Sequence, residues 1–98
     1  MVVTKNAENN KVTFNVSGRL DTATAPELET ELSACWDDCE ELVIDLEGLE
    51  YMSSAGLRLL LAAQKKMTPK GGMKVIHVND VVREVFDITG FSDFLTIE

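Results

Sequence analysis

An α/β fold with one mixed β-sheet and helices packed on it is predicted from two patterns in the sequence. An apolar run at 42–46, a Leu- and Ala-rich segment at 57–67 and a strand-like segment at 73–78 follow one another. Strand, helix and strand in this order form a βαβ unit, in which the two strands are parallel and the crossover is right-handed. Strand-like segments at 2–5 and 11–16 form a hairpin, which makes the sheet mixed. The full predicted order is β-β-α-β-α-β-α-β.

The size and composition of the chain restrict the functions that need to be considered. Its 98 residues suffice for a single domain, which we expect to span residues 1–98. Hydrophobic residues make up 45% of the chain and charged residues 27%, which is typical of a folded, soluble protein. The net charge of −8 excludes nucleic acid as an expected partner, because phosphate backbones repel an acidic protein.

Neither membrane insertion nor secretion is predicted. The longest unbroken apolar run, Leu59–Ala63, is much too short to cross a bilayer. The N-terminal residues Met1–Lys5 lack the order of basic and then apolar residues that marks a signal peptide. We therefore expect a cytoplasmic protein.

The first two strands are predicted from alternation and from a turn signal. Val12, Phe14 and Val16 alternate with polar residues and so share one face of a strand. Asn9-Asn10 lies between the two strand-like segments and favours a tight turn, so an antiparallel pair is expected. Ser17-Gly18 is expected to end the second strand.

The first helix is predicted to begin near Thr24. Thr24 and Glu27 match a capping box, in which each side chain bonds the other residue's backbone, and Pro26 suits a first helical turn. The expected apolar stripe consists of Leu28, Leu32, Cys35 and Trp36. The helix should end near the acidic cluster at 37–41, because negative charge is unfavourable at a helix C-terminus.

The central βαβ unit begins with Leu42–Leu46, whose continuous apolar character suits a strand that is buried on both faces. Residues 47–50 are expected to form a turn, and residues 51–56 to lead into the next helix. That helix, Leu57–Met67, is rich in Leu and Ala and carries basic residues in its last turn.

The C-terminal part is predicted to contain a strand at 73–78, a third helix and a last short strand at 94–97. Asn79 is a suitable cap for the third helix, and Gly90 is suited to end it. The residues of this helix that should face inward are Val82, Val85 and Phe86.

The two cysteines do not predict a disulfide or a metal site. Cys35 and Cys39 are four residues apart, so on a helix they would share one face and behave as small buried hydrophobic residues. A metal site needs more ligands than two thiols, and His77 is the only histidine. We therefore expect no metal and no cofactor.

One segment, Ser53-Ser54-Ala55-Gly56, calls for a chemical explanation. Its small residues leave a helix N-terminus uncovered, where backbone N–H groups and the helix dipole favour an anion. An ordinary N-cap explains one serine but not two. Three functions compete for the segment: it binds a phosphate-bearing ligand, supplies a catalytic serine, or accepts a phosphate from a partner kinase.

The first two of these functions lack their sequence signatures. Neither G-x-x-x-x-G-K-[ST] nor G-x-G-x-x-G occurs, as a nucleotide site would require. G-x-S-x-G is also absent, and only His77 could act as a base for a serine nucleophile. We expect His77 to be a half-buried structural residue within its strand, and the protein not to be an enzyme.

Three motifs in order resemble the STAS domain of anti-sigma factor antagonists, also called anti-anti-sigma factors. They are Gly18–Asp21, Leu42–Leu46 and Tyr51–Leu57. The resemblance covers nearly the whole chain and includes further residues, namely Gly71, Gly72, Val82, Phe86, Gly90 and Phe91. It implies a STAS fold, with a mixed β-sheet and packed helices.

The resemblance also implies a phosphorylation-controlled partner switch. Unphosphorylated members of the family bind an anti-sigma factor that is also a serine protein kinase. The kinase inactivates them by phosphorylation, and a PP2C-type phosphatase restores them. The family's phosphoacceptor corresponds to Ser54. The preceding residue is often Asp in the family and is Ser53 here, so that a second hydroxyl is present.

A physical account of such a switch can be given from the residues themselves. We expect Ser53 to cap the helix and Ser54 to project its hydroxyl to solvent. A phosphate on Ser54 would be tolerated by the helix N-terminus but would oppose a closely fitting partner. Arg58 lies one turn further on and is expected to pair with the phosphate, to touch the partner, or simply to be solvated. The expected partner-binding residues are Asp21, Thr22, Ser53, Ala55, Gly56, Leu57 and Arg58.

Two other functions stay open at this point. Stand-alone STAS proteins also resemble accessory subunits of ABC transporters, which dock on the ATPase without a phosphorylation cycle. A sensor that binds a small molecule on the sheet is a third alternative. A shared fold does not decide between these functions.

Overall fold

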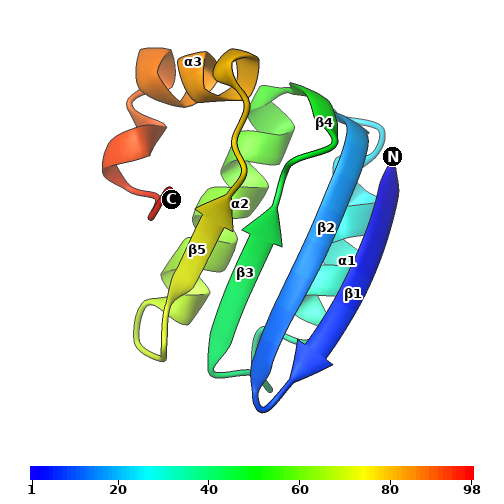
Figure 1. Cartoon of the computed structure of the whole chain (residues 1–98), viewed down its shortest axis with the longest axis vertical. Coiled ribbons are helices and arrows are strands. Elements are labelled where there is room, and N and C mark those ends of the chain that lie inside the picture. Colours follow the sequence, from blue (N-terminus) through cyan, green and yellow to red (C-terminus); the bar gives the residue numbers. More distant parts are fainter.

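A five-stranded mixed sheet is the framework of the computed structural model, which describes residues 1–98 (Figure 1). Its strands are β1 (Val2–Glu8), β2 (Lys11–Leu20), β3 (Glu41–Asp45), β4 (Leu49–Met52) and β5 (Met73–Ile76). The strand order is β1-β2-β3-β5, and β4 pairs with β2. The helices are α1 (Ala25–Ser33), α2 (Ser54–Met67) and α3 (Asp80–Thr89), followed by a 3₁₀ helix, η1 (Phe91–Asp93). The predicted α/β class is confirmed.

The N-terminal hairpin is confirmed, but its second strand is longer than expected. β1 and β2 are antiparallel, and the turn residues Asn9 and Asn10 have φ values of 50° and 71°, a conformation that Asn tolerates well. The prediction that Ser17-Gly18 ends β2 is wrong. At Gly18, whose φ is 86°, the register shifts and the strand continues to Leu20. β2 therefore pairs with β3 in its first half and with β4 in its second half.

The predicted βαβ unit is also confirmed, because β3 and β5 are parallel and α2 connects them through the crossover. Leu42 and Ile44 point into the core, and Val43 on the opposite face of β3 is also buried. The expected turn at 47–50 is wrong in part, because β4 begins at Leu49. This four-residue strand forms only because the extended end of β2 offers it a partner, which no local pattern reveals.

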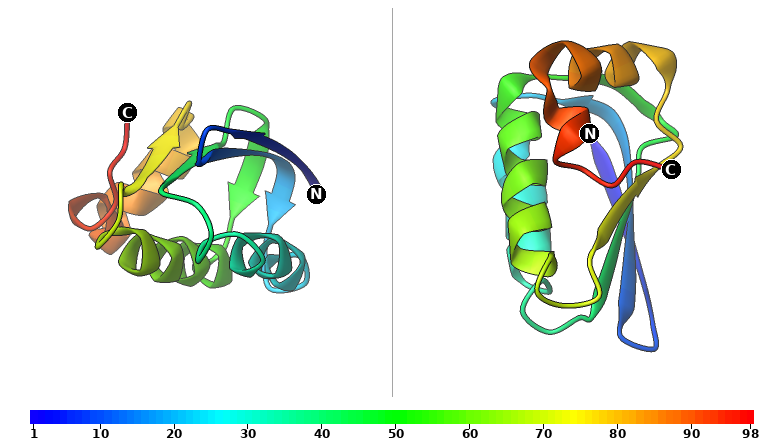
Figure 2. Two further views of the ribbon diagram at one scale, coloured as in Figure 1. Left: turned by 90° about the horizontal axis from the view of Figure 1, so that it is seen from below. Right: turned by 90° about the vertical axis from the view of Figure 1, so that its left-hand side faces the viewer.

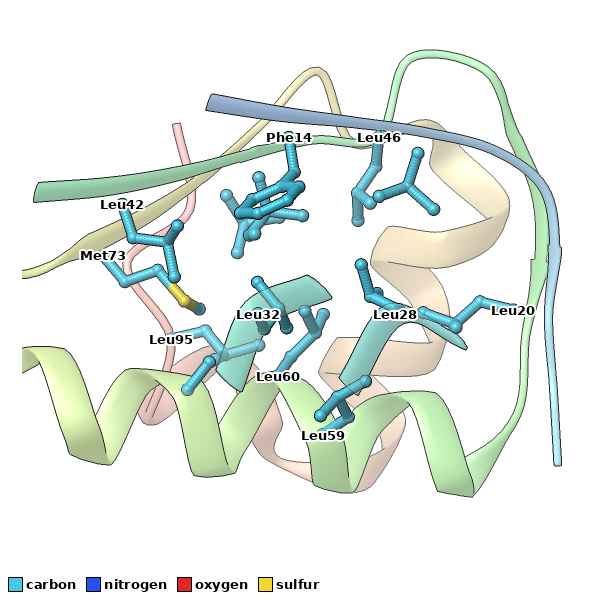
Figure 3. Packing of buried hydrophobic residues seen from close by; sticks show 14 of the residues in the cluster. Phe14, Leu20, Leu28, Leu32, Leu42, Leu46, Leu59, Leu60, Met73 and Leu95 are labelled. Carbon is cyan, nitrogen blue, oxygen red and sulfur yellow. The ribbon is translucent and has the colours of Figure 1, made fainter. Parts of the chain in front are cut away.

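Helices α1 and α2 cover the same face of the sheet, and the opposite face carries no helix (Figure 2). A cluster of 24 buried hydrophobic residues fills the space between sheet and helices. In Figure 3, Phe14 and Leu46 point from the sheet toward Leu28, Leu32 and Leu60 on the helices. No helix of the chain combines the length and the apolar character that crossing a membrane demands.

Helix α1 begins where the sequence predicted, but its cap and its end differ from the prediction. Thr24 is the N-cap residue, but its hydroxyl donates to the carbonyl oxygen of Arg19 at 2.8 Å and forms no cap with the helix, so the predicted capping box is wrong. The helix ends at Ser33, before the two cysteines. Cys35 and Cys39 are nevertheless buried, as expected, and burial raises the pKa of the Cys35 thiol to about 11.

Helix α3 follows its sequence signals closely. The Asn79 side chain accepts a hydrogen bond from the backbone N–H of Val82 at 2.9 Å, and Gly90 ends the helix with a φ of 79°. Of the three residues expected to face inward, Val82 and Phe86 are fully buried, and Val85 is half-buried against the core. The predicted last strand at 94–97 is wrong: the chain forms η1 and then makes a single bridge between Ile97 and Val75.

Candidate functional site

The N-terminus of α2 lies at the end of the molecule where the parallel strands β3 and β5 also end (Figure 1). The helix begins at Ser54, whose side chain is exposed and forms no hydrogen bond with the rest of the protein. Its first turn contains no acidic residue. The first backbone N–H groups of a helix have no partners within the helix, so this end of α2 presents donors and partial positive charge next to a free hydroxyl.

Ser53 holds the N-cap position through its backbone, but not through its side chain. Its N–H donates to the carbonyl oxygen of Leu20 at 2.9 Å, and its carbonyl oxygen accepts from the N–H of Leu57 at 3.1 Å. The hydroxyl oxygen of Ser53 is buried and has no hydrogen-bond partner. The expectation that the Ser53 side chain caps α2 is therefore wrong. Because the Ser53 hydroxyl bonds to no N–H group of α2, no side chain covers the N–H groups of the first turn of this helix.

Asp21 lies in the β2–α1 loop and is held by a local network. Its Oδ1 accepts hydrogen bonds from the N–H groups of Ala23 at 3.0 Å and Thr24 at 3.1 Å. These bonds, above all the one from Thr24, lower the pKa of Asp21 below its usual value. Arg19 adds a weak ion pair, with 3.7 Å between its Nε and the Asp21 Oδ2. Asp21 is thus a fixed negative charge directly after Leu20, the residue whose carbonyl holds Ser53.

A shallow groove between α1 and α2 brings several of the predicted partner-binding residues together. Its volume is about 260 Å³, and it is lined by Thr22, Ala25, Pro26, Glu29, Ala55, Arg58, Leu59 and Ala62. The floor is mainly apolar, with Glu29 and Arg58 as its charged residues. The sequence motifs did not point to the α1 residues of this groove, because only the packing of α1 against α2 places them beside Ala55.

Two residues predicted to contact a partner, Gly56 and Leu57, are buried instead. A Cβ atom on Gly56 would lie 2.8 Å from Cγ of Leu20 and 3.0 Å from Cγ of Met52. The missing side chain therefore allows the first turn of α2 to sit directly on β2 and β4. These two residues position Ser54, and the exposed contact surface consists of their neighbours.

The variant Gly56→Val should lose about 1–3 kcal/mol of unfolding free energy, because its side chain overlaps buried atoms of Leu20 and Met52. Urea denaturation measures this loss. Ala55→Val is the matched control, since Ala55 is only half-buried and its variant should stay within about 0.5 kcal/mol of the parent. Equal stability of the two variants would show that close packing at Gly56 does not constrain α2.

The histidine is not placed to activate a serine. His77 was expected to be half-buried within a strand, but it follows β5, and its side chain is 57% exposed. Its Nδ1 lies 3.0 Å from Oδ2 of Asp45, and no hydrogen bond connects it to Ser54. Ser54 is therefore not part of a serine–histidine pair in this structure.

Comparison with known proteins agrees with the geometry. The family model described as "STAS domain" matches residues 1–98. BtrV of Bordetella bronchiseptica is 41% identical over 78 residues, which cover 78% of this chain and 67% of BtrV. The anti-sigma-B factor antagonist of Bacillus subtilis is 30% identical over 89 residues, covering 90% of this chain and 82% of that protein.

A solved structure shows the same fold over nearly the whole chain. The crystal structure of an anti-sigma factor antagonist from Mycobacterium paratuberculosis superposes with a TM-score of 0.89 at 29% identity, covering 98% of this chain and 83% of that chain. The two sequence relatives and the protein in this crystal structure all carry the name anti-sigma factor antagonist.

Proposed function

The chain belongs to the STAS domain family, and from this premise we propose that it is an anti-sigma factor antagonist whose binding is switched off by phosphorylation of Ser54. The observation that carries the proposal is the exposed Ser54 hydroxyl at an uncovered helix N-terminus. The names of the relatives in Bacillus subtilis and Mycobacterium paratuberculosis support the antagonist function.

The unphosphorylated protein binds through the exposed surface around the start of α2. Ser54 and Arg58 come from α2, and Thr22 comes from the β2–α1 loop; all three are exposed. The half-buried Ala55 and Asp21 complete this contact surface. Small side chains at 54 and 55 let a partner backbone approach closely, and the fixed carboxylate of Asp21 favours a basic group on the partner.

Phosphorylation of Ser54 acts on the complex more than on the fold. A phosphate adds about −1.5 to −2 charges and three strong acceptor oxygens. The free N–H groups of the first α2 turn tolerate that charge locally, so the domain stays folded. In the complex, the same phosphate adds bulk where small side chains fit the partner and must lose its water, so partner binding is opposed.

The proposed partner is an anti-sigma factor that is also a serine protein kinase, with a PP2C-type phosphatase reversing the modification. The net charge of −8 suits a partner with a basic docking face. Because Ser54 is exposed, the docking face of the partner can reach it from solvent.

A direct test is to incubate the purified chain with ATP and a candidate serine kinase. We expect the intact mass to rise by one phosphate, with the modified peptide containing Ser54. Addition of a PP2C-type phosphatase should return the original mass. Stable binding to an ABC-transporter ATPase with no added phosphate would instead support the accessory-subunit function.

A further inference from the structure

Three side chains with metal-binding atoms meet on the face of the sheet that carries no helix. Asp45 is the last residue of β3, and His77 directly follows β5, the strand that neighbours β3. Glu47 belongs to the short loop between β3 and β4. Since Leu42, Ile44 and Leu46 point toward the helices, Asp45 points away from them, on the opposite side of the sheet from the core. Parallel pairing of β3 and β5 thus creates a cluster from residues 32 positions apart.

The distances within the cluster are close to those of a coordinated ion. Nδ1 of His77 lies 3.0 Å from Oδ2 of Asp45 and 3.9 Å from Oε2 of Glu47, and one ligand atom from each residue falls within 4.8 Å of the others. Ligands of a tetrahedral zinc ion, with bonds of about 2.0–2.2 Å, are roughly 3.3–3.6 Å from one another. A movement of the exposed Glu47 side chain is enough to close the remaining gap.

The central ligand is already oriented by the backbone. Oδ1 of Asp45 accepts a hydrogen bond from the N–H of Glu47 at 3.0 Å, which leaves Oδ2 directed at His77. A hydrogen bond to the second carboxylate oxygen is the kind of support that fixes metal ligands in proteins. The Asp45 side chain is only 14% exposed, whereas that of Glu47 is 81% exposed. The cluster therefore combines one fixed ligand with one that can adapt.

We propose that Asp45, Glu47 and His77 bind a divalent first-row transition metal ion, for which Zn²⁺ is the best match. One imidazole nitrogen and two carboxylate oxygens suit Zn²⁺ and its neighbours, whereas Mg²⁺ and Ca²⁺ prefer oxygen ligands alone. Three protein ligands leave a fourth coordination position for water or for a ligand atom of another molecule. An open, polar groove of about 300 Å³ adjoins Asp45 and Glu47 and gives access to that position.

Calorimetric titration of the untagged chain with ZnCl₂ tests the site, with MgCl₂ as the comparison ion. We expect one Zn²⁺ per chain and no heat from Mg²⁺. The variants His77→Gly and Asp45→Asn each remove a ligand atom. Loss of a residue that only supports a ligand weakens metal binding by about 10–100-fold, so each of these variants should weaken Zn²⁺ binding by more than that. His77 has a φ of 56°, which glycine adopts without strain, so His77→Gly should fold normally.

Glu41→Gln is the matched control, because it removes one carboxylate charge from the other end of β3 and from the same face. It should bind Zn²⁺ as the parent does. Manganese-induced broadening of amide signals then locates the ion, which should affect residues 45, 47 and 77 first. The proposal is overturned if the parent binds no Zn²⁺, if His77→Gly binds as tightly as the parent, or if the broadening centres elsewhere.

Discussion

Replacing Ser54 by Asp should weaken binding to the anti-sigma factor kinase by about 100-fold, whereas Ser54→Ala should bind nearly as the parent does. A permanent carboxylate at the start of α2 introduces a negative charge at the position where phosphorylation adds about −1.5 to −2. Removing a charged group from water in a closely fitting interface costs several kcal/mol, and each 1.4 kcal/mol is about tenfold in affinity. Alanine keeps the small, neutral surface that the partner needs. Surface plasmon resonance with the immobilised kinase measures both affinities.

The same variants separate the role of Ser54 from that of its neighbour. Ser54→Ala should take up no phosphate, and Ser53→Ala should be phosphorylated normally, since the Ser53 hydroxyl is buried. Ser33→Asp is the charge control, because it introduces the same carboxylate at an exposed serine at the far end of α1. Tight binding by Ser54→Asp, or phosphate on Ser54→Ala, would contradict the proposed switch.

The largest effect on stability is expected from Phe14→Ala, which should lose about 3–5 kcal/mol of unfolding free energy. Phe14 lies in the middle of β2, is completely buried and points toward the helices that cover the sheet (Figure 3). Its neighbours belong to several elements and close such a cavity only in part, so the loss includes both transfer and cavity terms. Urea denaturation followed by circular dichroism measures the change.

Phe94→Ala is the control for this experiment. It makes the same chemical change at a side chain that is 65% exposed, so the loss should stay below about 1 kcal/mol. A domain of this size is stabilised by about 5–15 kcal/mol, so Phe14→Ala removes a large share of the total. Similar losses in the two variants would show that Phe14 does not hold sheet and helices together.

Where local chemistry decides the structure, the sequence predicted it well. Asn79 and Gly90 mark the ends of α3 because a side-chain cap and a left-handed residue act on their immediate neighbours. Asn9-Asn10 specifies the hairpin turn for the same reason. The exposed Ser54 at the start of α2 was likewise predicted from small residues between a strand and a helix.

The features that sequence reasoning missed depend on partners far away in the chain. β4 forms because β2 continues past the bulge at Gly18 and provides backbone groups with which β4 can pair. The Thr24 side chain does not cap α1, because its hydroxyl donates a hydrogen bond to the carbonyl oxygen of Arg19 instead.

The amino-acid order by itself therefore determined the α/β class and the serine at the helix start, since periodicity and turn signals act over a few residues. Its motifs also carried the resemblance to the STAS family. Only the tertiary structure decided that Gly56 and Leu57 are buried and that Asp45 and His77 meet. The physical reason is that strand pairing and helix packing join residues that are distant in sequence, and their contacts are specified by the whole fold rather than by any local pattern.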